Sequence, residues 1–153
     1  MTKRIIPVLL GLLLLLSCAV AEGHHLTVEL PTDARKVEDV TFEDGDRIET
    51  WQLSGGASIQ ILEFRGPASL SDMIGAWDAP ASVADIPVPR VDGRPSQGIR
   101  FLSTEGDTDY SVTVLRITEE RNTYFFETVF PQRLGDEQID AIVDSMIRSL
   151  HFT

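Results

Sequence analysis

Cysteine and histidine are scarce in this sequence, and their scarcity excludes several kinds of chemistry. Cys18 is the only cysteine among 153 residues, so the chain cannot form an internal disulfide. The three histidines are His24, His25 and His151, and none stands in a G-x-S-x-G, H-E-x-x-H or phosphate-loop motif, since the sequence contains none of these. We therefore expect a protein that is not an enzyme and that needs no cofactor.

Basic residues are scarce as well. The chain has 13 lysines and arginines against 24 acidic residues, a net charge of −11. All the acidic residues follow position 21 whereas Lys3 and Arg4 precede it, so removal of the first 21 residues leaves a net charge of −13. This charge disfavours nucleic acid and anionic lipid headgroups as partners, because like charges repel. It is compatible with a basic partner or with cations, and we attribute most of it to solubility.

The sequence lacks an apolar run long enough to anchor it in a bilayer. The apolar segment from Ile5 to Leu16 has only twelve residues, and a spanning helix needs about 20. A basic pair precedes this segment and small residues follow it, the pattern of a secretion signal. We predict a signal peptide over 1–21 and one domain over 24–153, exported to the periplasm, the outer membrane or the medium.

Two cleavage signals overlap at the end of this segment. Ala19-Val20-Ala21 has the small side chains that signal peptidase requires, and cleavage after Ala21 makes Glu22 the first residue. Leu15-Leu16-Ser17-Cys18 resembles the bacterial lipobox, in which cleavage before Cys18 leaves a lipidated cysteine as the first residue. Both routes stay open, and a lipid on Cys18 is the one membrane contact that we expect.

Cleavage after Ala21 also predicts a metal site. The new terminus would read Glu22-Gly23-His24-His25, in which the free amine, two amides and the His24 imidazole can surround Cu(II) or Ni(II) in a square plane. His25 would add a further donor. The alternative is an exposed terminus without a ligand, and lipidation of Cys18 would remove the free amine.

Alternating apolar residues and turn signals predict an antiparallel sheet. The expected strands are 25–30, 37–42, 47–53, 57–64, 98–103, 110–118 and 123–130, joined by turns at Asp44-Gly45, Gly55-Gly56 and Asp92-Gly93. Residues 78–90 contain three prolines and are expected to be loop or edge structure. Apolar residues on both faces of 110–118 and 123–130 predict central strands covered on both sides.

Two segments have helical periodicity. Leu70, Met73, Ile74 and Trp77 predict a short helix within 69–77, capped by Ser69 or Ser71. An apolar stripe from Ile139 to Leu150 predicts a C-terminal helix capped by Asp136. The fold class is therefore α+β, with six to seven strands and the two helices packed on the sheet.

Aromatic and acidic residues leave some alternatives open. Trp51 and Trp77 are expected in the core, although they could line a ligand groove. Two acidic turns could supply oxygen ligands to Ca²⁺, but we expect ordinary solvated turns. These turns contain Glu43, Asp44 and Asp46, and Glu105, Asp107 and Asp109.

The element order and the ending Ile142-Val143-Asp144-Ser145-Met146-Ile147-Arg148-Ser149-Leu150-His151-Phe152 resemble the Mog1/PsbP-like α/β/α sandwich superfamily. The resemblance covers about residues 24–153 and carries over no site residues. It implies a cell-envelope protein that binds a protein partner or serves as an assembly factor. The alternative is a small-molecule or metal (Cu, Ni or Ca) binding protein, and the oligomeric state is left open.

Overall fold

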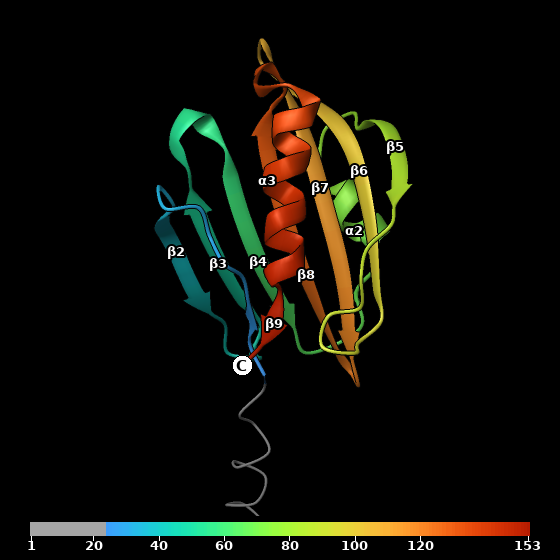
Figure 1. The fold of residues 1–153 in the computed structure, drawn as a ribbon. Helices are drawn as coiled ribbons and strands as arrows, with labels where there is room; N and C mark the ends of the chain where they lie inside the picture. The colour runs from blue at the N-terminus through green and yellow to red at the C-terminus, as the bar shows by residue number, and fades with distance from the viewer. Residues whose placement is uncertain (1–23) are drawn as a thin grey trace, which may run out of the picture.

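The computed structural model describes residues 24–153, which are built around a seven-stranded antiparallel sheet with the order β2-β3-β4-β8-β7-β6-β5 (Figure 1). The observed sheet confirms the predicted strand number and the antiparallel pairing. Its strands are β2 (Arg35–Thr41), β3 (Arg47–Gln52), β4 (Ser58–Phe64), β5 (Ala81–Ile86), β6 (Ser96–Glu105), β7 (Thr108–Glu119) and β8 (Asn122–Pro131).

β8 is the middle strand of the sheet, and β7 is its neighbour. On β8, Tyr124 and Phe126 belong to one hydrophobic cluster, whereas Phe125 and Val129 belong to a second cluster on the opposite face. Successive side chains of a strand point to opposite faces, so a strand with apolar residues on both faces must be covered on both sides. The predicted central position of these two strands is confirmed.

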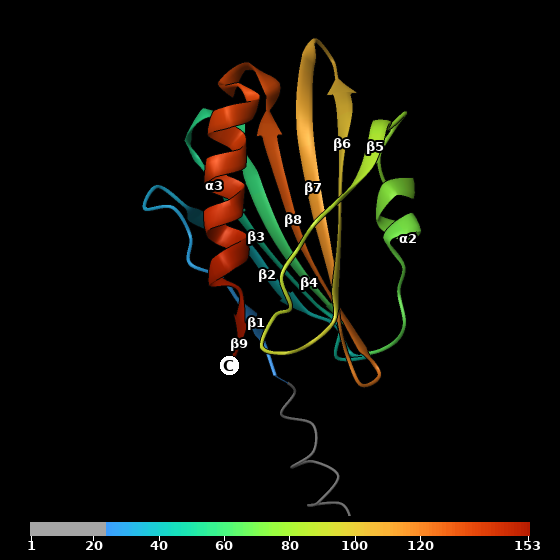
Figure 2. The ribbon, with the colours of Figure 1, turned by 45° about the vertical axis from the view of Figure 1, so that its right-hand side comes forward.

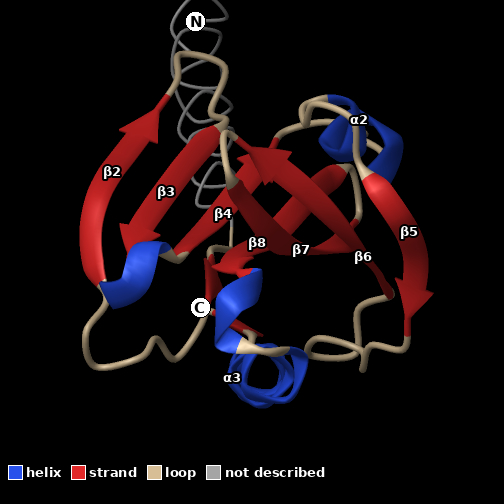
Figure 3. Cartoon of the chain, turned by 90° about the horizontal axis from the view of Figure 1, so that it is seen from above, coloured by secondary structure: helices blue, strands red, loops and turns tan. Residues whose placement is uncertain are grey.

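The two helices lie on opposite faces of the sheet (Figure 2). α3 (Asp136–Ser149) packs its apolar stripe on the face of Tyr124 and Phe126, and α2 (Leu70–Gly75) places Met73 on the other face. Figure 3 shows the same arrangement from above, with α2 near the β5 and β6 side of the sheet. This layering confirms the predicted α/β/α arrangement.

The predicted turns join the strands as expected. Gly45 has φ 90° in the β2–β3 turn, and Gly55 has φ 79° in η2 (Ser54–Gly56), the short 3₁₀ turn before β4. A positive φ strains any residue with a Cβ, which explains why glycine stands at these turns. The predicted loop or edge region contains β5, an edge strand that pairs only with β6.

The two ends of the described chain pair with each other. β1 (Leu26–Thr27) and β9 (His151–Phe152) form a separate two-stranded sheet. The predicted first strand over 25–30 is therefore too long. β9 has only two residues with which β1 can pair, and a strand of two residues is too short to give a periodic pattern in the sequence. The Phe152 ring packs edge-on against Tyr124 at 4.9 Å between centroids, which fixes the C-terminus on the sheet.

Of the two predicted helix caps, one is confirmed and the other is wrong. Ser69 caps α2, and its partner Asp72 completes a capping box. Asp136 does not cap α3: the N-cap is Gly135 with φ 81°, and no side chain bonds to the free N–H groups there. The 3₁₀ turn η3 (Gln132–Leu134) brings the chain to the helix through this left-handed glycine, so Asp136 is already the first helical residue.

The predicted signal peptide, with Cys18, Ala21 and Glu22, lies outside the described residues. Within 24–153, none of the helices is both long and apolar enough to span a membrane.

Candidate functional site

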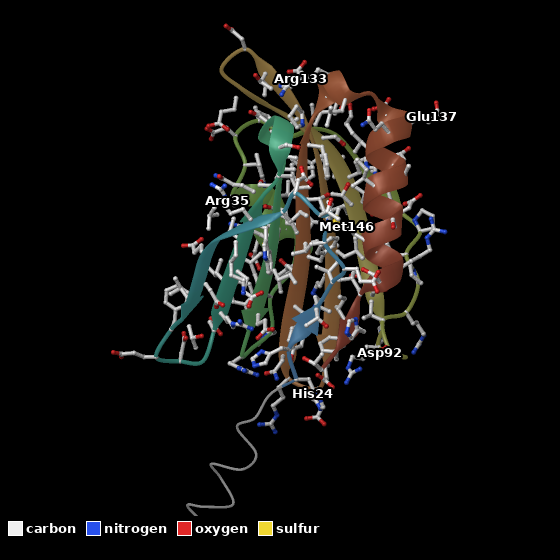
Figure 4. All side chains as sticks on the ribbon, turned by 60° about the vertical axis from the view of Figure 1, so that its left-hand side comes forward. His24, Arg35, Asp92, Arg133, Glu137 and Met146 are labelled. Carbon is white, nitrogen blue, oxygen red and sulfur yellow. The ribbon has the colours of Figure 1, made fainter. Side chains whose placement is uncertain are left out.

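The predicted metal ligands His24 and His25 lie at the end of the domain where β1 pairs with β9, and Figure 4 labels His24 there. The His24 carbonyl accepts a hydrogen bond of 3.1 Å from the Tyr124 hydroxyl, which holds the start of the domain against β8. His25 places Nδ1 at 2.9 Å from Oε2 of Glu63. The other predicted ligands, the free amine and the amides before His24, lie outside the described residues, so the copper site stays a prediction.

Glu63 is a buried carboxylate that fixes the first strand. Its side chain is 2% exposed, and it accepts a hydrogen bond from the backbone N–H of Leu26 besides its contact with His25. An unpaired carboxylate in this position would be strongly destabilising, so these contacts explain why the chain at 25–26 lies against β4. This arrangement is a structural anchor for the domain's N-terminus.

A network of ion pairs extends from this anchor across β2 and β3. Arg47 pairs with Asp39 and Glu49, and Lys36 pairs with the same two acids. The hydrogen bonds from Arg47 and then Lys36 lower the pKa of Asp39. Lys36 also lies 5.2 Å from the centre of the Trp51 ring, which is buried as predicted. These contacts connect β2 to β3, so we assign them a structural role.

The acidic turns close hairpins with their own carboxylates. Asp44 accepts from the backbone N–H of Asp46 at 3.1 Å, and Asp46 accepts from the backbone N–H of Arg65 at 2.7 Å. In the second turn the Thr104 hydroxyl donates to Asp109. Among residues 24–153, no group of three or more His, Cys, Asp or Glu side chains is arranged to hold a metal ion.

The candidate site is a hollow on the α2 side of the sheet, which we call the Trp77 hollow. It has a volume of about 500 Å³ and combines polar and aromatic side chains with the backbone of the η2 turn. Its lining residues are Gln52, Leu53, Gly56, Ala57, Ser58, Trp77, Glu105, Tyr110 and Val129. Trp77 thus both packs on the core residue Phe101, at 6.2 Å between ring centroids, and lines a groove.

Glu127 is a buried acid beside this hollow. It lies on the central strand β8, is 6% exposed, and accepts a hydrogen bond of 3.2 Å from Nε1 of Trp77. Burial raises the pKa of Glu127, and the hydrogen bond from Trp77 opposes this shift only in part. A buried carboxyl group with a raised pKa next to a hollow is a feature of binding and active sites.

A polar row connects Glu127 to the edge of the sheet. In the register of the strands, Glu127 lies opposite Gln60, which lies opposite Thr50 on β3 and then Glu38 on β2. The Gln60 amide donates to the Thr50 hydroxyl at 3.1 Å, and that hydroxyl donates to Glu38 at 3.0 Å. The row therefore presents oriented hydrogen-bonding groups across half of the sheet.

The same half of the sheet is open on the α2 side. Leu62 and Phe64 of β4 pack against the α2 cluster, and the alternation of the strands places the neighbouring residues of β2 and β3 on this face. α2 lies behind β6 and β7, so no helix lies over β2 and β3 on this side (Figures 1 and 2). We call this surface the open half-face; it comprises Glu38, Val40, Ile48, Thr50, Gln52 and Gln60.

Exposed apolar side chains accompany these polar groups. Val40 on β2 is 39% exposed, and Phe42 at the end of the strand is 48% exposed. The hollow and the open half-face offer hydrogen bonds, an aromatic wall and apolar contacts, which are the means of binding. Neither surface includes a histidine or a cysteine.

The sequence predicted Trp77 in the core and kept a groove as the alternative, and it gave no prediction for Glu127; in the structure Trp77 is half-buried and lines the hollow. The signal was available, because Glu127 is the only charged residue in the segment 123–130, which was predicted to be buried on both faces. An acid in such a strand must lie among buried groups or in a hollow. No comparable signal in the sequence predicts that the η2 turn brings Gly56 to the hollow.

Comparisons with known proteins show the fold and leave the family open. No protein-family model matches the chain, and no curated protein matches its sequence. Among solved structures it is similar to LpqN, which is described as involved in cell envelope biogenesis of Mycobacterium tuberculosis. The match has a TM-score of 0.50 and 8% sequence identity, and it covers 86% of this chain and 84% of LpqN. At this identity the similarity confirms the predicted α+β fold and goes no further.

Proposed function

We propose that this chain is an exported, non-enzymatic protein of the cell envelope that binds a protein partner through the Trp77 hollow and the open half-face. The observation that carries the proposal is the uncovered half of the sheet, which ends in a hollow beside a buried acid. We further propose that the chain is a member of the Mog1/PsbP-like superfamily, and that it acts in the periplasm, on the outer membrane through Cys18, or in the medium.

Several features support this proposal. The open half-face mixes exposed apolar side chains such as Val40 with an ordered polar row, the composition of a protein interface. The likeness to LpqN supports a role in the envelope, and the segment 1–21 supports export. The residues around Glu127 include a hydrogen-bond donor, Trp77, but no nucleophile paired with a base, which supports binding in place of catalysis.

Site-specific photo-crosslinking in the expressing cell tests the partner. A benzophenone side chain at position 52 stands in the hollow, and the same side chain at Glu137 stands exposed on the face of α3. We expect a discrete protein adduct from position 52 and none from position 137. Adducts of equal yield from both positions would contradict the proposal.

Two variants show whether the hollow itself is used. Trp77→Ala removes the aromatic wall, and Glu105→Arg reverses a charge at the exposed rim without touching the core. Both should reduce the adduct from position 52 several-fold. An adduct that is insensitive to Glu105→Arg in a folded protein would place the partner elsewhere.

A second candidate function is the binding of a small polar molecule. The hollow's volume of about 500 Å³ lies within the range of ligand pockets, and its lining residue Trp77 donates a hydrogen bond to the buried carboxyl group of Glu127. Native mass spectrometry of the protein recovered from the envelope would then show a bound mass that Trp77→Ala loses. A bound mass without a position-52 adduct would favour this function over partner binding.

A further inference from the structure

A second hollow gathers three arginines in a chain that is otherwise strongly acidic. It has a volume of about 410 Å³ and lies on the α2 side, where β4 and β7 end and β8 begins. Its lining residues are Arg65, Gly66, Pro67, Arg116, Thr118, Glu120, Arg121, Asn122 and Thr123. Three arginines against one acid make this a locally positive site on a molecule with a net charge of −11.

These arginines are free of ion pairs within the described residues. The ion pairs of residues 24–153 use Lys36, Arg47, Arg94 and Arg100 as cations, together with His25, and none involves an arginine of this hollow. Unpaired arginines are the groups that an incoming anion can engage, because no protein carboxylate has to be displaced first.

Two of the guanidinium groups are held in place by backbone carbonyls. Nε of Arg116 donates to the Ala68 carbonyl at 2.6 Å, and Nε of Arg65 donates to the Gly45 carbonyl at 3.1 Å. Each bond uses one edge of the guanidinium and leaves the Nη groups without a partner among residues 24–153. A guanidinium group that is already oriented loses little conformational freedom when an anion binds, so it suits the bidentate contact that arginine makes with phosphate.

The hollow lies at the same end of the domain as His24, the first described residue. Thr123 in its lining is followed directly by Tyr124, whose hydroxyl holds the His24 carbonyl at 3.1 Å. A chain held at a membrane by its N-terminal segment would therefore present this end to the headgroups. The acidic Glu105, Asp107 and Asp109 lie in and around the β6–β7 turn, at the opposite end of the sheet.

We propose that the hollow formed by Arg65, Arg116 and Arg121 is an anion site that binds a phosphate group, either free or carried by a lipid headgroup. Arg65 and Arg116 supply oriented guanidinium groups, Arg121 in the exposed β7–β8 turn adds a third positive charge, and the Thr118 hydroxyl can donate a further hydrogen bond. Glu120 opposes binding and limits the affinity. The site is separate from the Trp77 hollow, so either proposal can fail without the other.

The test uses the processed protein recovered from the expressing cell and two probes at constant ionic strength. Inorganic phosphate is titrated by calorimetry, and binding to phosphatidylglycerol-containing vesicles is compared with binding to pure phosphatidylcholine vesicles by sedimentation. The test variant is R65Q/R121Q, which leaves the Arg116 contact with the Ala68 carbonyl intact. R148Q is the matched control, because Arg148 is exposed on α3 outside the hollow.

We expect saturable binding to at least one probe, weakened about tenfold or more in R65Q/R121Q, as loss of charge-assisted bonds implies. R148Q should bind like the parent protein, and E120Q should bind more tightly. Binding of phosphate alone identifies a free anion as ligand, and binding of the anionic vesicles alone identifies a headgroup. No binding to either probe, or equal binding by a folded R65Q/R121Q, would overturn the proposal.

Discussion

At the scale of single residues, Glu127 shows how a buried acid makes stability depend on pH. Burial raises the pKa of Glu127 above its ordinary value of 4.5, so the folded protein binds this proton more tightly than the unfolded chain does. The stabilising effect is full below pH 4.5 and is lost as the pH rises through the raised pKa. Glu127 therefore lowers the free energy of unfolding at neutral pH relative to acid pH.

Glu127→Gln removes this dependence because an amide does not titrate. We expect the free energy of unfolding of the variant, relative to the parent protein, to rise from pH 4.5 to neutral pH, because only the parent protein loses a stabilising proton over this range. Urea unfolding at several pH values measures this difference. A difference that stays flat across this pH range would contradict the account.

Gly98 illustrates a second constraint at this scale. A Cβ at this position would lie 2.7 Å from Cγ1 of Val88 and 2.8 Å from Cγ1 of Ile86, closer than carbon atoms approach each other. We expect Gly98→Ala to reduce the free energy of unfolding by about 1–3 kcal/mol, as overpacking does. Urea unfolding measures the effect.

The control for this prediction is Gly75→Ala, since no atom lies within 4 Å of a Cβ built there. The double variant Gly98→Ala/Val88→Ala should recover part of the loss. If Gly98→Ala were as stable as the parent protein, the contact between β6 and the segment 86–88 would be looser than described.

At the scale of elements, the capping box of α2 is the feature most easily tested. The Ser69 side chain accepts from the backbone N–H of Asp72, and the Asp72 carboxylate accepts from the N–H and hydroxyl of Ser69. The backbone bond and then the hydroxyl bond lower the pKa of Asp72. The sequence alone left Ser69 and Ser71 as equal candidates for the cap.

Ser69→Ala should cost about 1 kcal/mol of unfolding free energy, the usual effect of losing an N-cap. Ser71 is the second residue of the helix and is exposed, so Ser71→Ala should change stability by less than about 0.5 kcal/mol. Thermal unfolding of the two variants under one set of conditions makes the comparison. Equal losses would mean that Ser69 does not act as the cap.

Elements with a strong local pattern could be predicted, and those that depend on distant partners could not. The α3 stripe from Ile139 to Leu150 and the alternation around Tyr124 specify their burial in the sequence itself. β9 has two residues, and it forms a strand only because it pairs with β1. Its residue Phe152 lies opposite Leu26, which is 126 positions earlier in the sequence. The failed Asp136 cap has a similar origin, since η3 decides how the chain enters the helix.

The candidate site was harder to predict than the fold for the same reason. Trp77 stood out as an aromatic on a helical stripe, but its partner Glu127 is 50 positions away, and only the strand register brings them within 3.2 Å. The arginine hollow combines residues from the segment that follows β4, from β7, from the β7–β8 turn and from the start of β8. Arg65, Arg116 and Arg121 share no sequence motif, and tertiary structure alone assembles them.

At the scale of the whole molecule, the two proposed sites lie at opposite ends of the sheet. The Trp77 hollow lies beside the η2 turn and the β6–β7 turn, whereas the arginine hollow lies beside the chain termini. Figure 4 shows this polarity through His24 and Asp92 at one end and Arg133 and Glu137 at the other. A domain held by its N-terminal segment would turn the arginine hollow toward its anchor and the Trp77 hollow toward partners.

This orientation applies to a chain that carries a lipid on Cys18, and both routes of processing require export, which is the central claim of the proposed function. Intact-mass measurement of the protein from the expressing cell tests it most directly. We predict a chain that begins at Glu22, with the mass of residues 22–153, or one that begins at Cys18 and carries the added mass of lipid. An unprocessed chain that retains residues 1–21 and stays in the cytoplasm would contradict the account.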